Sequence, residues 1–80
     1  MNERKVKYDA EHDVLYIFLG PPRYGYEDEV YPGIFLRKDE DSDEVIGAII
    51  MDFTKKNKSI MRSQIPFTVD YDAVSKEFTH

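Results

Sequence analysis

The stretch Val14-Leu15-Tyr16-Ile17-Phe18-Leu19, stopped at once by Gly20-Pro21-Pro22, decides the fold. Six consecutive β-forming residues bounded by turn residues predict a strand. Successive side chains of a strand point to opposite faces, so Val14, Tyr16 and Phe18 share one face and the other three residues share the second. Neither face is polar. Both faces need a cover, because a strand of this kind left open would aggregate.

The residues before this strand predict its hairpin partner. Lys5 to Tyr8 alternate between polar and apolar residues, as a short half-buried strand does. Asp9 follows at a position from which its carboxylate can accept backbone N–H bonds in an Asx turn. Residues 4–19 therefore predict a β-hairpin.

Two further strands are predicted downstream of the loop over residues 20–28. Glu29 to Lys38 has strand-like alternation, but Pro32-Gly33 interrupts it and predicts a bulge or an edge position. The acidic turn over residues 39–44 leads into a fourth strand, Val45 to Phe53. That strand is again apolar on both faces apart from Gly47, which indicates a bulge or a close backbone approach.

The hydrophobic period then changes to that of helices. Thr54 can cap a helix over about residues 54–64, which Pro66 ends. Its narrow apolar stripe consists of Ile60, Met61 and Ile65. Asp70 can cap a last short helix to Glu77, whose apolar residues are Tyr71, Val74 and Phe78.

These elements predict one domain, residues 1–80, of the α+β class. It is a small antiparallel sheet of about four strands followed by a C-terminal helical segment that packs on one face. The chain has no cysteine, which excludes disulfides and thiolate–zinc sites as a source of stability. A chain of 80 residues with two-sided apolar strands needs another cover for the second face. We therefore predict a homodimer.

The charge pattern limits the classes of partner. The net charge of −5 disfavours binding to nucleic acid, which needs a basic face. Residues 27–44 hold eight acids against two bases, and residues 55–62 hold four bases and no acid. Both runs are typical of solvated surface, and the acidic run is also suited to a basic protein partner. No apolar stretch has membrane-spanning length and no signal-peptide core is visible, so we expect no membrane association and a cytoplasmic location.

Few residues suggest chemistry. Asp39 to Glu44 resembles the start of an EF-hand loop, but Glu44 and Ile50 stand where the loop needs Gly and Glu. The remaining metal candidates are Asp9, His12 and Asp13, which a turn explains better than a metal site does. No nucleophile lies in a catalytic motif, so we expect neither an enzyme nor a cofactor.

Tyrosines offer a further possibility. Tyr16, Tyr24, Tyr26 and Tyr31, with Arg23 among them, could stack on RNA bases as sheet-based RNA-binding domains do. No run of basic and aromatic residues accompanies them, and three acids follow Tyr26 directly. Packing in a core or an interface explains these tyrosines better.

Two motifs stand out at a fixed spacing in the chain. The first is Lys7-Tyr8-Asp9-x-Glu11-x-Asp13-Val14-Leu15-Tyr16-Ile17. The second joins Gly33-Ile34-Phe35-Leu36, an acidic turn and Val45-Ile46-Gly47-Ala48-Ile49-Ile50-Met51-Asp52. Together these motifs resemble a widespread prokaryotic family, domain of unknown function 2283, over about residues 5–55. Ile49 stands where that family often has Glu. The resemblance implies a small antiparallel sheet with a C-terminal helical segment and no established activity, and some members look like partners in toxin–antitoxin-type gene pairs.

Two hypotheses follow. The first is a non-catalytic, homodimeric protein-interaction module whose acidic surface binds a basic partner, in its sharpest form as an antitoxin does. The alternative is a small-ligand or metal-binding domain with weak hydrolytic activity that uses Asp9, His12 and Asp13.

Overall fold

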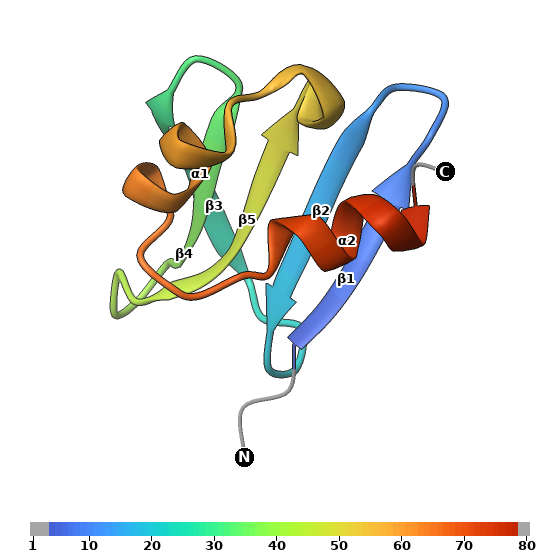
Figure 1. Ribbon diagram of the computed structural model, residues 1–80. Coiled ribbons are helices and arrows are strands. Elements are labelled where there is room, and N and C mark those ends of the chain that lie inside the picture. Colours follow the sequence, from blue (N-terminus) through green and yellow to red (C-terminus); the bar gives the residue numbers. More distant parts are fainter. Residues whose placement is uncertain (1–3, 79–80) are drawn as a thin grey trace.

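The computed structural model describes residues 4–78, in which a five-stranded antiparallel sheet is followed by helices (Figure 1). The strands are β1 (Arg4–Asp9), β2 (Val14–Leu19), β3 (Gly25–Tyr31), β4 (Ile34–Asp39) and β5 (Val45–Met51). They are followed by a 3₁₀ turn, η1 (Phe53–Lys55), and by the helices α1 (Lys58–Gln64) and α2 (Tyr71–Phe78). The predicted α+β class is confirmed.

The two strands that are apolar on both faces lie side by side in the middle of the sheet. The strand order is β1-β2-β5-β4-β3, and every neighbouring pair is antiparallel. β5 therefore occupies the centre, with two strands on each side. This arrangement removes the backbone edges of the most apolar strands from solvent and leaves the charged β1 and β3 at the edges.

The single third strand predicted over Glu29–Lys38 is in fact two strands. Pro32 and Gly33 form a tight turn between β3 and β4, and Gly33 has a positive φ of 80°. Proline fixes its own φ and glycine accepts the left-handed region, so this dipeptide reverses the chain. The predicted bulge or edge position is also present, because the β3–β4 register shifts between Glu29 and Tyr31 and β3 is an edge strand. The sheet therefore has five strands, and β3 begins at Gly25, inside the segment expected to be a loop.

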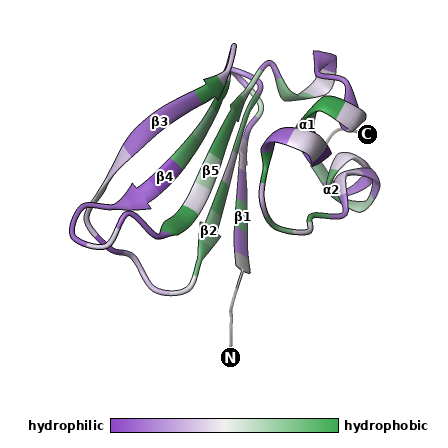
Figure 2. Ribbon diagram, turned by 90° about the vertical axis from the view of Figure 1, so that its left-hand side faces the viewer, coloured by the Kyte–Doolittle hydropathy of each residue, from purple (hydrophilic) through white to green (hydrophobic). Residues whose placement is uncertain are grey.

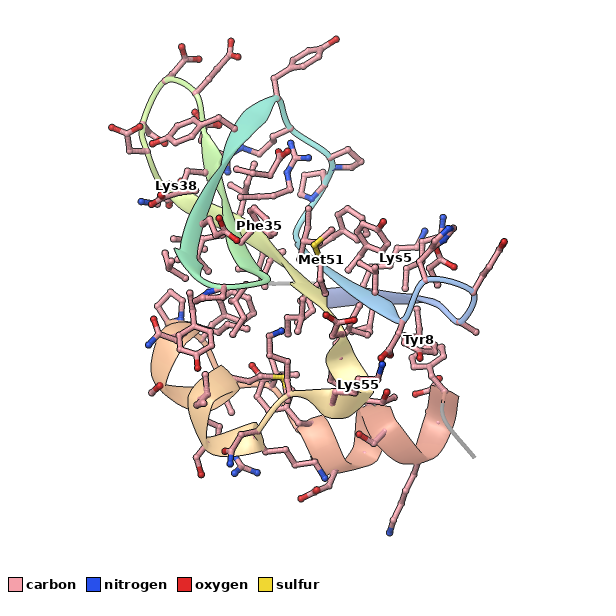
Figure 3. The ribbon with its side chains drawn as sticks, turned by 90° about the horizontal axis from the view of Figure 1, so that it is seen from above. Lys5, Tyr8, Phe35, Lys38, Met51 and Lys55 are labelled. Carbon is pink, nitrogen blue, oxygen red and sulfur yellow. The ribbon has the colours of Figure 1, made fainter. Side chains whose placement is uncertain are left out.

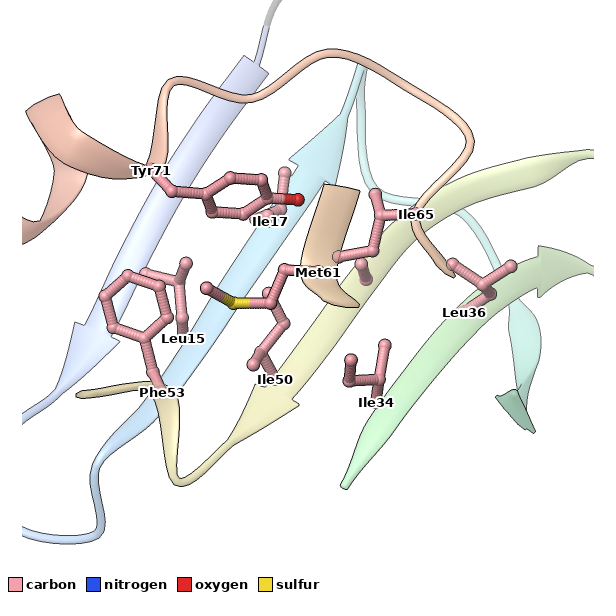
Figure 4. Packing of buried hydrophobic residues seen from close by; sticks show 10 residues of the cluster. Leu15, Ile17, Ile34, Leu36, Ile50, Phe53, Met61, Ile65 and Tyr71 are labelled. Atoms are coloured by element: carbon pink, nitrogen blue, oxygen red, sulfur yellow. The ribbon is translucent and has the colours of Figure 1, made fainter. Parts of the chain in front are cut away.

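The helices cover one face of the sheet (Figure 2). The side chains of β2, β4 and β5 on that face are the most deeply buried of the sheet, with Leu15, Ile34 and Ile50 fully inaccessible. Met61 and Tyr71 lie against them from the helical segment (Figure 4). The rest of this core consists of Ile17, Leu36, Ala48, Phe53 and Ile65.

Both predicted helices exist, and the first begins later than expected. Asn57 is its N-cap, because the Asn57 side chain accepts N–H bonds from Ser59 and Ile60. Asp70 caps α2 as predicted, through the N–H of Ala73 at 3.1 Å. Neither helix in residues 4–78 has the length and apolar character to cross a bilayer.

Gly47 fulfils both expectations from the sequence. The β4–β5 register shifts between Arg37 and Lys38, which leaves a bulge beside Gly47. A Cβ atom added at Gly47 would lie 2.5 Å from the Ile17 carbonyl oxygen of β2. A side chain at this position would therefore push the two central strands apart.

We expect Gly47→Ala to lower the free energy of unfolding by about 1–3 kcal/mol, the usual cost of forcing an extra methyl into a packed site. Urea denaturation followed by circular dichroism measures this change. Gly20→Ala is the matched control, since nothing lies within 4 Å of a Cβ there and only its positive φ opposes the substitution. A Gly47→Ala protein as stable as wild type would contradict the close approach.

Candidate functional site

The face of the sheet turned away from α1 and α2, here called the open face, carries a continuous set of apolar side chains. No helix within residues 4–78 packs against it (Figure 2). Figure 3 places Phe35 and Met51 on this side of the sheet and Tyr8 and Lys55 on the helix side. The set consists of Val14, Tyr16, Phe18, Phe35, Ile49 and Met51.

Solvent reaches most of this set. Met51 is 45% exposed and Val14 only 6%, while the other four side chains are half-buried. Contiguous apolar surfaces that no element of the protein covers are often sites where other molecules bind. The open face is therefore the candidate functional site.

The register of the strands aligns the open face into two rows that cross the whole sheet. The central row runs Lys7, Tyr16, Ile49, Phe35, Glu29 from β1 to β3. The next row runs Lys5, Phe18, Gly47, Arg37, Glu27. Each row thus begins with a lysine on the β1 edge and ends with a glutamate on the β3 edge.

A shallow hollow of about 370 Å³ lies at the β1 end of this face. It is lined by Tyr16 and Phe18 of the open face and by Lys7, Tyr8 and Asp9 of β1. Two aromatic rings bordered by charged groups suit an apolar side chain of a protein partner better than a small polar substrate.

The metal candidates are not brought together as ligands. Asp9 accepts hydrogen bonds from the backbone N–H groups of Glu11 and His12, at 3.1 and 3.3 Å, as the predicted Asx turn requires. Its second oxygen lies 2.8 Å from His12 Nδ1, and the bond from His12 lowers the pKa of Asp9. Residues 4–78 hold no cluster of three or more His, Asp or Glu side chains that could bind a metal ion.

The Asp13 side chain interacts with β1 and η1 and not with Asp9 or His12. Its carboxylate accepts hydrogen bonds from the Tyr8 hydroxyl at 2.7 Å and from the Thr54 hydroxyl at 2.7 Å. The Thr54 N–H also donates to this carboxylate, and the N–H of Phe53 donates to the Asp13 carbonyl. Asp13 therefore fastens the β1–β2 turn to η1.

The charge of Asp13 is stabilised in place. Burial opposes ionisation, but the bonds from Thr54 and Tyr8 outweigh it and lower the pKa of Asp13. Its backbone adopts the left-handed conformation with φ of 55°, which Asp tolerates better than most residues. Sequence reasoning missed this contact because Thr54 is 41 positions away, and no local pattern announces it.

The acidic turn between β4 and β5 has the chemistry of a hairpin. Asp39 accepts N–H bonds from Asp41 and Ser42, at 2.9 and 3.1 Å, and pairs with Arg23 at 2.6 Å. These bonds lower the pKa of Asp39 to about 2. The Tyr26 hydroxyl donates to Asp43 at 2.7 Å. Two of the carboxylates that could suggest calcium are thus used within the fold.

The basic run after η1 is partly neutralised within the fold. Lys58 and Arg62 of α1 both face Asp72 of α2. The ammonium of Lys56 donates to the Met51 carbonyl at 2.9 Å. Three of the four bases of this run are therefore bonded to groups of α2 or to the end of β5.

The tyrosines do not form a common stacking platform. Tyr16 lies on the open face, whereas Tyr31 packs against the core under the helices. Tyr24 is 87% exposed in the loop before β3. A hydrogen bond to Asp43 accounts for Tyr26 and packing against the core accounts for Tyr31, whereas Tyr16 is part of the open face.

The model of the family described as "Protein of unknown function (DUF2283)" matches residues 5–54. The matched segment holds all five strands, both rows of the open face and the Asp13–Thr54 contact. It ends before α1 and α2. No curated protein and no solved structure matches the chain.

We expect Asp13→Ala to lower the free energy of unfolding by about 2 kcal/mol at pH 7, because it removes bonds to a charged acceptor. The pKa of Asp13 is lowered in the folded state, so its contribution is complete above the unfolded value near 3.8 and is lost as the pH falls through the folded value. Urea unfolding at pH 7 and at acidic pH measures the difference from wild type. Asp13→Asn, which tolerates the same backbone conformation, is the control and should cost less; equal stability of wild type and Asp13→Ala at pH 7 would refute the role.

Proposed function

The chain belongs to the family described as protein of unknown function (DUF2283), and from this premise we propose that it is a non-catalytic protein-interaction module that acts as a homodimer. The observation that carries the proposal is the open face. Its six apolar side chains lie on three adjacent strands, β2, β5 and β4, with no described helix above them. A protein partner is the usual cover for such a surface.

The size of the open face supports a stable contact. Five strands about 4.8 Å apart and six residues of about 3.3 Å each span roughly 24 by 20 Å. Covering this face on two copies buries about 1,000 Å² in total, which is near the lower limit for a specific interface. A chain of 80 residues with a radius of gyration of 12.1 Å has few other ways to extend its core.

The arrangement of polar side chains supports a non-catalytic role. Asp9 and Asp13 hold turns together, and His12 is engaged by Asp9. Ser42 and Ser63 form local bonds, to the Glu44 N–H and the Ile60 carbonyl. A serine nucleophile needs a base within hydrogen-bond reach, and these hydroxyls are bonded to backbone groups instead.

The finer part of the proposal is an antitoxin-like role in which an acidic surface binds a basic protein. β3 carries Glu27, Asp28 and Glu29, and the turn before β5 lies near the start of β3, where the Glu40 N–H reaches the Tyr24 carbonyl at 3.5 Å. Arg37 and Lys38 offset part of this charge. Glu40 and Asp41 are exposed at the tip of the turn, where a basic surface could approach them.

We expect wild-type protein to sediment as a dimer at micromolar concentration and Ile49→Glu to raise the dimer Kd at least about 100-fold, because two unpaired carboxylates would be buried at its centre. Sedimentation equilibrium measures both proteins, and circular dichroism checks their folding. Ala73→Glu adds the same charge on α2, on the other side of the sheet, and should leave the dimer intact. A wild-type monomer at these concentrations would sink the proposal.

For the finer part, we expect a basic protein to be retained in stoichiometric amount from native lysate at 50 mM salt and released at 1 M, since salt screens surface charge. Glu40→Lys with Asp41→Lys should abolish retention without changing the dimer. Lys76→Glu on α2 is the control. Recovery of no stoichiometric partner at low salt would count against the antitoxin-like role and leave the homodimer untouched.

A further inference from the structure

We propose that a second copy of this chain covers the open face about a two-fold axis parallel to β5, so that the lysine edge of each sheet lies over the glutamate edge of the other. The inference rests on the proposed homodimer and adds to it the orientation of the two copies. It is carried by the two rows of the open face and by the position of β5 at the centre of the sheet.

The charges at the two ends of each row are opposite. Lys5 and Lys7 lie on β1 with exposed side chains, and Glu27 and Glu29 lie on β3 with exposed side chains. Glu27 already contacts Arg37 at 3.5 Å, and one oxygen of Glu29 accepts the Gly33 N–H at 3.1 Å. The sheet therefore presents a positive edge and a negative edge with an apolar strip between them.

A two-fold axis that runs along β5 reverses the order of the strands across the interface. β5 then lies over β5 of the second copy, β2 over β4 and β1 over β3. Each row meets the same row in reverse, so Lys7 faces Glu29 of the second copy and Lys5 faces Glu27. Both charge contacts occur twice, because a two-fold interface repeats every contact.

The interior of each row is also self-complementary under this axis. Tyr16 meets Phe35 of the second copy, Ile49 meets Ile49, and Phe18 meets Arg37. Aromatic pairs and an arginine on an aromatic face are favourable contacts. Gly47 lies over Gly47, so neither copy places a side chain at this point of the interface.

The other two-fold axis in the plane of the interface, perpendicular to the strands, gives the opposite result. It places β1 over β1 and β3 over β3, so Lys7 would face Lys7 and Glu29 would face Glu29. Like charges opposed in this way destabilise a contact. The charges of the rim therefore select the axis parallel to β5.

The known geometry of sheet packing is compatible with this axis. Sheets that pack face to face lie about 10 Å apart with strands within about 30° of one another. At the edge strands this angle shifts the rows by about 5 Å, less than the spacing between residues on one face. The flexible side chains of Lys5 and Lys7 therefore still reach Glu27 or Glu29 of the second copy.

The test is a charge exchange measured by sedimentation equilibrium at 50 mM NaCl. Lys5→Glu with Lys7→Glu places four like-charge contacts in the homodimer, and we expect its Kd to rise about 10- to 100-fold, with a smaller change at 1 M NaCl. An equimolar mixture with Glu27→Lys/Glu29→Lys should restore dimerisation as a heterodimer. Lys55→Glu with Lys76→Glu makes the same change in net charge on the helix side and should have little effect.

A mixture of wild type with the Lys5→Glu/Lys7→Glu protein distinguishes the two axes even if the Glu27→Lys/Glu29→Lys protein fails to fold. Under the proposed axis one edge is attractive and the other repulsive, so this heterodimer has an affinity between those of the two homodimers. A heterodimer tighter than both homodimers indicates the perpendicular axis and overturns the inference. If the charge-exchange variants leave the dimer Kd unchanged while Ile49→Glu still raises it, the proposed orientation is wrong and the proposed homodimer stands. If wild-type protein is a monomer, both the orientation and the homodimer are wrong.

Discussion

β2 and β5 lie side by side in the middle of the sheet, although the loop, β3 and β4 separate them in the chain, and the other elements attach to this pair. β1 adds to one side through a short hairpin, and β4 adds to the other through the acidic turn. The close approach of Gly47 to the Ile17 carbonyl fixes how tightly the two strands meet. After β5, the Thr54 hydroxyl donates a hydrogen bond to the Asp13 carboxylate, which fixes η1 against the β1–β2 turn. Both helices follow from there on one face of the sheet.

The strands that the sequence predicted best are those whose β-forming, apolar character is visible in their own residues. The two-sided apolar character of residues 14–19 and 45–51 is visible locally and predicts two strands that need a cover on both faces. The structure adds that these two strands are neighbours in the middle of the sheet. β3 was missed because Glu27, Asp28 and Glu29 have low strand propensity, and an edge strand tolerates them only because solvent and the bases of β4 take up their charge. Pro32-Gly33 was recognised as an interruption of a strand. It could be identified as a turn between two strands only if the acidic segment before it was also a strand.

The candidate metal residues illustrate the limit of sequence proximity. Asp9, His12 and Asp13 are neighbours in the chain. Asp9 nevertheless accepts hydrogen bonds from backbone N–H groups of the turn, whereas Asp13 accepts them from Tyr8 and Thr54. The residues of the open face are the opposite case. They are spread over all five strands, and only the register brings Lys7, Ile49 and Glu29 into one line. A row of this kind depends on pairings between distant segments, which composition and periodicity do not determine.

The charged edges also bear on how the proposed dimer would avoid open-ended assembly. β1 is a positive edge strand and β3 a negative one, so direct strand pairing between the β1 edge of one copy and the β3 edge of another would be attractive and would continue without limit. The alternation of a strand places Lys5 and Lys7 on the open face and Val6 and Tyr8 on the helix face. Packing two open faces about an axis along β5 uses the same lysines and glutamates between two copies only. The proposed closed pair would therefore satisfy the attraction that would otherwise join sheet edges, and it would also cover the apolar strip.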